Sequence, residues 1–364
     1  MRKLLCAALG SLLLSLLFFP AVAFAAAEQA LALWWQVIAP ALLPFFILSE
    51  LLLASGAPAY LGRALTPLMQ PLFNLPGAAA IAVALGFCSG FPTGALLTAA
   101  LRRDGCLSRA EAERLLAFTN NAGPLYIVTG VSTGLFGCPQ LALLLAPLHY
   151  GGNLLLGVAL GRLARHSPRP RSSPALTPPA AARPRDLGAP GVLLKTAAQK
   201  AVANIALIGC YMVLFAVLTA MLGAWRLLGG DALSLALTAG LFEMSIGIDQ
   251  LAALPLAQAL PWTAALLAWG GLSVQAQVAA MVAGTDIRLR VYLLCRVVHA
   301  ALSLAGVWLV CRLLPLPLGA AAIQPPPAAP QIFAAATVLA LLCAALLGLS
   351  SYIWQKKRRS KTAS

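Results

Sequence analysis

The chain has 364 residues; 61% are hydrophobic, only 10% are charged, and the formal net charge is +15. Soluble globular domains carry about 25% charged residues, so this composition excludes an ordinary soluble protein and predicts an all-α polytopic membrane protein in a lipid bilayer. The basic residues fall in short loops and at the chain ends, where membrane topology places them, so they do not indicate a nucleic-acid partner.

Apolar runs long enough to cross about 30 Å of hydrocarbon recur along the chain. They cover roughly residues 4–26, 33–56, 115–136, 140–162, 198–222, 262–285, 291–314 and 332–354. The first run ends near Ala23-Phe24-Ala25, which resembles a signal-peptide cleavage site, but its apolar core is longer than the roughly 7–15 residues of the apolar region of a signal peptide. We therefore expect a retained first helix.

Two other apolar runs, about 68–101 and 231–258, are predicted to fold back as re-entrant hairpins. Basic residues favour the cytoplasmic side, and the basic N-terminus starts there. Full crossing by 68–101 would leave the arginines of 102–114 outside, whereas a turn at Ser89-Gly90 keeps them inside. The same reasoning makes 231–258 fold back from the outer face and leaves both termini in the cytoplasm.

Residues 164–190 are rich in Pro, Arg, Ser and Ala, a composition typical of a disordered linker. On each side of it the predicted order is helix, re-entrant hairpin, helix, helix, entered from opposite faces of the membrane. Such an inverted-topology repeat brings discontinuous elements together near the bilayer midplane. The predicted units are an N-terminal transmembrane helix (1–30), a first repeat (31–163), the cytoplasmic linker (164–190), a second repeat (191–315), and a C-terminal transmembrane helix with a basic tail (316–364).

Helix breakers and hydroxyls interrupt the run at Gly86-Phe87-Cys88-Ser89-Gly90-Phe91-Pro92-Thr93-Gly94. Pro lacks an amide hydrogen and Gly favours non-helical backbone, so freed backbone groups at membrane depth need protein or a water-filled cavity. Broken helices of this kind line solute sites in secondary transporters. We predict that Ser89, Gly90 and Thr93 bind solute; the alternative is a kink of small residues that only packs.

Two amides, Asn120 and Asn121, enter an apolar segment just before Pro124, which should distort the helix. Each amide brings two donors and an acceptor. They suit a neutral or anionic solute rich in heteroatoms; the alternative is a helix cap or a hydrogen bond between helices.

An acid, Glu243, stands at the expected tip of the second hairpin, two residues before Ser245. A carboxylate in a bilayer costs roughly 2.5–3.5 kcal/mol on insertion scales, so it is a functional candidate. Glu243 could take a proton, hold Na⁺ or accept a solute hydrogen bond; otherwise it pairs structurally with another buried group. Glu50, the other such acid, is expected near the cytoplasmic end of its helix, within reach of water.

A flexible entry, Gly270-Gly271, precedes Ser273 and Gln277, which lie one helical turn apart on one face. These two side chains could meet the first hairpin and bind solute, or they could join helices by hydrogen bonds. Arg296 and His299 are weaker candidates, because Arg296 could extend to the cytoplasmic surface.

Catalytic and metal-binding patterns are missing from the sequence. The chain has three histidines, no Gly-x-Ser-x-Gly and no His-Glu-x-x-His, and its eight cysteines show no Cys-x-x-Cys spacing. We expect no catalytic residues, no metal site and no cofactor.

The motifs together resemble the YlbJ (SpoVV) sporulation integral membrane proteins, which carry the nucleoside-recognition Gate domain. The resemblance covers about residues 30–315 and rests on Pro40–Phe46, Gly86–Ala95, Asn120–Pro124, Glu243–Gly247 and Gly270–Gln277. It implies two Gate-like repeats and kinship with concentrative nucleoside transporters. It also implies a role in endospore formation, where the family is associated with moving dipicolinic acid across the outer forespore membrane.

Dipicolinate is a planar dianion, so helix N-termini, amides and hydroxyls would suit its carboxylates. A negative Glu243 would not, unless it were protonated or bound to a cation, which makes it a candidate for coupling to H⁺. Two alternatives stay open: a carrier of a nucleoside-like solute, and a non-transporting scaffold for spore envelope assembly. A homo-oligomer or a partner membrane protein also stays open.

Overall fold

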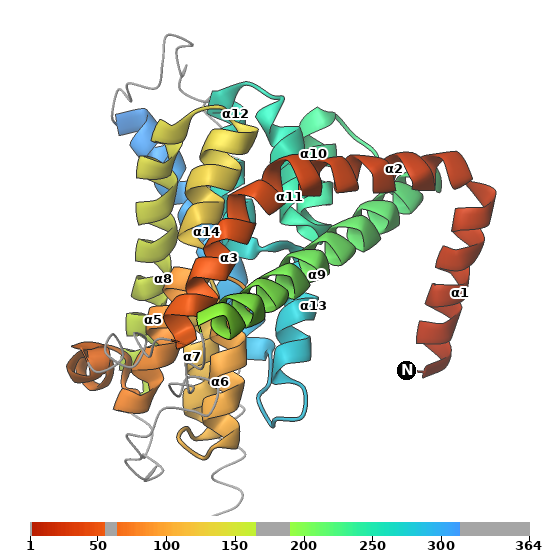
Figure 1. Cartoon of the computed structure of the whole chain (residues 1–364). Coiled ribbons are helices and arrows are strands. Elements are labelled where there is room, and N and C mark those ends of the chain that lie inside the picture. The colour runs from red at the N-terminus through yellow and green to blue at the C-terminus, as the bar shows by residue number, and fades with distance from the viewer. Residues whose placement is uncertain (1, 55–63, 165–189, 314–364) are drawn as a thin grey trace, which may run out of the picture.

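The computed structural model describes residues 2–54, 64–164 and 190–313, and every regular element in these ranges is helical (Figure 1). The predicted linker and the predicted run at 332–354 lie outside the described residues. The first half contains α1 (Arg2–Phe18), α2 (Pro20–Leu33), the π-helix η1 (Trp34–Ile38), α3 (Ala39–Ala54), the π-helix η2 (Met69–Phe73), the 3-10 helix η3 (Gly77–Ala79), α5 (Ala80–Ser89), α6 (Thr93–Arg103), α7 (Arg109–Thr119), the π-helix η4 (Tyr126–Leu135), the 3-10 helix η5 (Pro139–Leu141) and α8 (Ala142–Ala164).

The second half has fewer interruptions. It contains α9 (Pro190–Ala224), α10 (Ala232–Phe242), α11 (Met244–Ala252), α12 (Leu256–Trp269), α13 (Gly271–Val282) and α14 (Arg290–Leu313). Both halves therefore show a long helix, a pair of short helices, a helix broken in its middle, and another long helix. Their opposite entry into the membrane stays a prediction.

Five helical segments within the described ranges are long and apolar enough to cross a membrane, or six if one bent pair counts as a span. The five are Pro20–Leu48, Pro139–Ala164, Gly191–Ala224, Leu256–Val282 and Arg290–Leu313. They match five of the predicted runs. The bent pair, Ala64–Phe73 with Gly77–Ser89, turns by 112°.

The N-terminal boundary differs from the prediction. One helical segment begins already at Pro20, so the expected division at residue 30 falls inside it. Phe19 has non-helical backbone angles, and Pro20 is suited to the first position of a helix because its missing amide hydrogen has no helical partner there. The first helix is correspondingly shorter than expected and ends at Phe18.

Two short-helix pairs fold back on themselves, and we name them hairpin 1 (α5 and α6) and hairpin 2 (α10 and α11). Hairpin 1 turns at residues 90–92, and hairpin 2 turns at Glu243. The turn of hairpin 1 begins at Gly90, within the expected Ser89-Gly90. The turn of hairpin 2 lies at Glu243, as expected.

Two helices are discontinuous, and we name their interruptions the first break (residues 120–123, between α7 and η4) and the second break (Gly270, between α12 and α13). Pro124 was expected to distort one helix; instead, the four residues before it leave the helical conformation, and the helix resumes at Pro124. At the second break Gly270 adopts φ +85 and Gly271 φ +80, the left-handed region that glycine tolerates.

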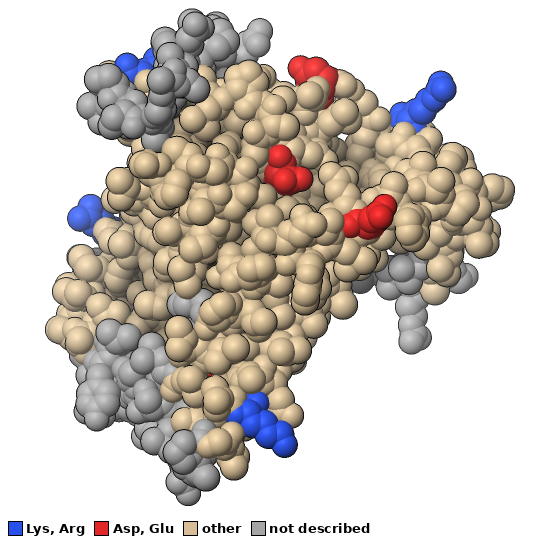
Figure 2. Space-filling view, turned by 45° about the horizontal axis from the view of Figure 1, so that its top comes forward, with Lys and Arg blue, Asp and Glu red and all other residues tan. Residues whose placement is uncertain are grey.

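The helices α2 and α3, which follow each other along one helical segment, both pack along α9 (Figure 1). The indole Nε1 of Trp34 donates to the carbonyl of Ile205 at 2.9 Å. Lys200 pairs with Glu50 at 2.8 Å, so Glu50 has an ionic partner on α9 in addition to any contact with water. Figure 2 shows a face on which most visible atoms belong to neither acidic nor basic residues, as a lipid-facing surface requires.

Candidate functional site

A pocket forms where both hairpin tips, both breaks and the middle of α3 and α9 meet. Its cavity volume is about 60 Å³. Six of the sequence-predicted site residues line it. They are Ser89, Gly90, Glu243, Ser245, Ser273 and Gln277.

Hairpin 1 contributes a tip that only glycine can form. Gly90 has φ +74, and a Cβ there would lie 2.7 Å from the backbone nitrogen of Gly123 in the first break. Thr93 does not line the pocket; it begins α6, and its backbone nitrogen donates to the carbonyl of Gly90 at 3.0 Å. The tip of hairpin 1 and the first break thus form one wall.

Hairpin 2 contributes the only carboxylate among the residues that line this pocket. Glu243 is 4% exposed and caps α11, because its Oε2 accepts a hydrogen bond from the backbone nitrogen of Ile246 at 2.9 Å. The hydroxyls of Ser245 and Tyr126 lie 2.9 Å apart. This hydrogen bond joins hairpin 2 to the helix that follows the first break.

The second break faces hairpin 2 closely. A Cβ on Gly271 would lie 2.9 Å from the backbone nitrogen of Met244. Beyond it, Ser273 is 1% exposed and borders the pocket, and its hydroxyl has no hydrogen-bond partner among the residues that the structure describes. A buried hydroxyl without a partner costs free energy, so Ser273 is available to a bound solute.

Asn120 and Asn121, in contrast, do not line the pocket. Both are fully buried on the side of the first break that faces α8 and α14. Asn120 donates to the Tyr292 hydroxyl at 3.1 Å, and the amide of Asn153 donates to the side-chain oxygen of Asn121. Both amides thus form hydrogen bonds between helices, which was the alternative to solute binding in the sequence analysis.

The backbone of the first break is also held from α8. The nitrogen of Ala122 donates to His149 Nε2 at 3.3 Å, and the Tyr150 hydroxyl donates to the carbonyl of Ala122 at 2.8 Å. The sequence pattern missed these partners because each is an isolated polar residue in an apolar run.

Arg296 lies in the protein interior and does not extend to the surface, contrary to the sequence-based expectation. It is 0% exposed and donates hydrogen bonds to Ala117, Asn120, Asn153 and Ala268. Its position in the sequence could have identified it. Arg296 is the seventh residue of α14, about two helical turns from the helix end, and a charged residue at that depth in an apolar helix usually faces the protein interior.

Three helix N-termini adjoin the pocket: those of α6, α11 and α13. The residues just before them, or at their start, border it; Phe91 precedes α6, Glu243 precedes α11, and Ser273 lies in the first turn of α13. A helix N-terminus carries partial positive charge and free amide hydrogens. The pocket is therefore suited to carboxylate oxygens of a solute.

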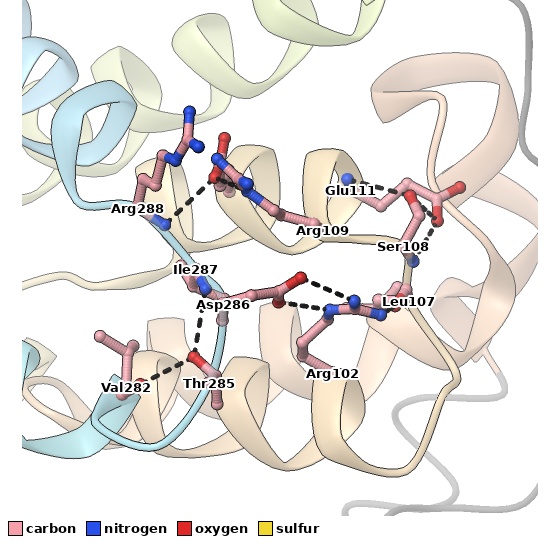
Figure 3. A network of polar contacts seen from close by, with 11 residues as sticks. Arg102, Leu107, Ser108, Arg109, Glu111, Val282, Thr285, Asp286, Ile287 and Arg288 are labelled. Atoms are coloured by element: carbon pink, nitrogen blue, oxygen red, sulfur yellow. Dashed lines mark hydrogen bonds and ion pairs between the residues drawn. The ribbon is translucent and has the colours of Figure 1, made fainter.

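A second polar network joins the two halves away from the pocket (Figure 3). Arg102, at the end of α6, binds both carboxylate oxygens of Asp286 in the loop before α14, at 2.8 and 2.9 Å. Nearby, Glu113 accepts from Arg109 at 2.7 Å and from the backbone nitrogen of Arg288 at 3.1 Å. The hydrogen bond from Arg102 lowers the pKa of the Asp286 carboxyl.

Comparison with known proteins identifies the family. A family model described as "Gate: Nucleoside recognition" matches residues 35–137. The sporulation integral membrane protein YlbJ of Bacillus subtilis (strain 168) is 35% identical over 321 residues, which cover 79% of this chain and 78% of that protein. The chain belongs to the YlbJ family of sporulation integral membrane proteins. No solved structure matches it.

Family membership accounts for the first half of the pocket in particular. The Gate match spans α3, hairpin 1, the first break and η4; hairpin 1 supplies Ser89 and Gly90 to the site, and η4 supplies Tyr126. Within the described residues, no three His, Cys, Asp or Glu side chains gather in a way that could hold a metal ion.

Proposed function

We propose that this YlbJ-family protein is a secondary transporter that carries a small polar or anionic solute, dipicolinate, across the outer forespore membrane. The observation that carries the proposal is the convergence of two hairpin tips and two helix breaks on one pocket. Discontinuous elements at a shared site are the usual architecture of solute binding in secondary transporters.

The substrate class follows from the chemistry of the pocket walls. Helix N-termini, the hydroxyls of Ser89, Ser245 and Ser273, and the amide of Gln277 are all able to donate to carboxylate oxygens. Asn120 and Asn121 support the first break from behind in this proposal.

Movement of the hairpins is part of the proposal. A space of about 60 Å³ holds no more than a few water molecules, so a pyridine dicarboxylate requires the tips to separate. Two repeats of opposite topology would allow the site to open to one face and then to the other.

Glu243 is the proposed site of coupling to H⁺. A protonated Glu243 can remain beside an anionic solute, whereas its carboxylate repels one, so proton and solute would bind together. Replacement by Gln keeps an oxygen for the backbone nitrogen of Ile246 but removes the titration.

The test is uptake of labelled dipicolinate and of uridine by reconstituted vesicles. We expect saturable dipicolinate uptake by the wild type, loss of it in Glu243→Ala, and uptake without pH dependence in Glu243→Gln. Asp231→Asn is the matched control, because Asp231 also caps a helix of hairpin 2 but is exposed and outside the pocket.

Two results would contradict the proposal. Uridine uptake without dipicolinate uptake would favour a nucleoside carrier, the alternative that the Gate match supports. Folded protein that moves neither solute would favour a scaffold, which predicts that deletion of 164–190 abolishes spore formation while Glu243→Ala does not.

A further inference from the structure

A buried positive charge lies behind the pocket without a carboxylate to balance it. Arg296 of α14 is 0% exposed. Among the described residues, no acidic side chain forms an ion pair with it. A buried charge is costly unless hydrogen bonds or an opposite charge compensate it.

The compensating groups are carbonyls at the ends of two helices. Arg296 Nη2 donates to Ala117 at 2.8 Å, and Nη1 donates to Asn120 at 3.1 Å; both carbonyls belong to the end of α7. Nη1 also lies 3.4 Å from the carbonyl of Ala268, at the end of α12. One guanidinium therefore binds the half-helices that precede both breaks.

Each broken helix brings two opposite poles close to the site. The half before the break ends in free carbonyls with partial negative charge, and the half after it begins with free amides and partial positive charge. Without Arg296, the partial negative charge of the carbonyl ends and the partial positive charge of the amide ends would largely cancel in the pocket. Arg296 neutralises the carbonyl ends, so the amide ends make the electrostatic potential of the pocket positive.

A separate observation, at the amide side of the second break, points to a ligand there. The hydroxyl of Ser273, in the first turn of α13, is buried, borders the pocket and has no partner. Arg296 itself is not among the residues that line the pocket.

We propose that Arg296 sets the preference of this site for anionic over neutral solutes by neutralising the carbonyl ends of both broken helices. The inference rests on the proposed transport function. Arg296 is a positioning residue: it does not touch the solute and acts through the helix ends that it binds.

The experiment compares two solutes of the same shape in reconstituted vesicles, labelled dipicolinate and its neutral diamide. The measured quantity is the ratio of their kcat/KM values. We expect Arg296→Met to lower the dianion-to-diamide ratio about tenfold, the effect of restoring partial charges of helix ends. Arg296→Lys keeps the charge and should keep the ratio, with slower uptake of both solutes.

Asn153→Asp separates charge from structure. The side-chain oxygen of Asn153 already accepts from Arg296, so Asp keeps this hydrogen bond and places a negative charge beside the guanidinium. Asn153→Asp should lower the ratio as Arg296→Met does. It also loses the hydrogen bond that the Asn153 amide donates to Asn121; Asn121→Ala loses the same bond without adding a charge, and this control should keep the ratio. Arg114→Met is the matched control, because Arg114 of α7 is half-buried and donates to the carbonyl of Asn74, away from both breaks.

The outcomes separate the inference from the function beneath it. Dipicolinate uptake with an unchanged ratio in Asn153→Asp overturns the inference alone, since a merely structural arginine would tolerate an ion pair. This variant decides the question even if Arg296→Met does not fold. Wild-type vesicles that take up neither solute reject the proposed function and the inference with it.

Discussion

The two hairpins differ in what holds them. Hairpin 1 packs both arms against α7: a Cβ on Gly86 would lie 2.1 Å from the carbonyl oxygen of Thr119, and one on Gly94 would lie 2.2 Å from it. Hairpin 2 packs its arms on each other, because a Cβ on Gly247 would lie 2.3 Å from the Cα of Gly240. The tight backbone contacts of hairpin 1 are therefore with a neighbouring helix, whereas the tightest backbone contact of hairpin 2 is between its own arms, with α12 and α13 packed beside them.

The two hairpins also differ in how the helix end nearest the pocket is capped. The start of α6 in hairpin 1 has no side-chain cap, while Glu243 caps α11 in hairpin 2. A pair of helices whose arms pack tightly on each other and whose inner helix end is capped from within can shift as one body, against the side chains of its neighbours. Of the two hairpins, hairpin 2 is better built for the movement that solute entry requires.

The largest expected effect is at the contact between hairpin 1 and α7. Gly86→Ala places a methyl group on the Thr119 carbonyl and should destabilise the fold by about 1–3 kcal/mol or abolish it, because backbone cannot yield easily. Thermal unfolding in detergent measures this. Gly151→Ala, which meets open space, should be tolerated; a wild-type midpoint for Gly86→Ala would show that hairpin 1 is not bound to α7.

An intermediate effect is expected where hairpin 2 contacts the other half. Tyr126→Phe and Ser245→Ala should each remove one hydrogen bond, with a coupling of about 0.5–1.5 kcal/mol in a double-mutant cycle of unfolding free energies. Ser303→Ala, which removes a buried hydroxyl without a partner, is the control. Additive free energies would mean that this contact does not restrain hairpin 2.

The smallest expected effect concerns the exposed pair that fixes the far end of hairpin 1. Arg102→Gln should lower the thermal midpoint slightly at pH 7, because the pKa of Asp286 is lowered in the folded protein by its hydrogen bond to Arg102. That stabilisation is present above the unfolded pKa of about 3.9 and is lost as the pH falls through the folded value. The difference from wild type should therefore begin to shrink at about pH 4 and reach its minimum only below the lowered pKa of Asp286, where the hydrogen bond from Arg102 to the carbonyl of Leu107 persists, while the neighbouring Arg103→Gln shows none at any pH.

Much of the fold could be predicted because helix breakers act locally. Pro92 and the glycines around it fix the turn of hairpin 1 within a few residues, and Gly270 fixes the second break in the same way. The predicted first run, 4–26, continued across Pro20 because the sequence stays apolar there, although proline favours the first position of a helix and α2 begins at it.

The site was harder to predict than the breaks. Ser273 and Gln277 line the pocket as the helical period suggested, but Asn120 and Asn121 face the opposite side, since non-helical backbone has no period from which a direction can be read. Arg296 was given a surface position because a long side chain usually reaches water; two helix ends far apart in sequence supply its partners instead.

One long helix connects the site to the thickness of the surrounding bilayer. With 35 residues, α9 is about 52 Å long at 1.5 Å per residue, against roughly 30 Å of hydrocarbon. It runs obliquely across the bundle in Figure 1, and Ile208 and Tyr211 from its middle line the pocket. A thinner or thicker membrane changes the slope at which such a helix fits, and with it the width of the space between α9 and the hairpin tips.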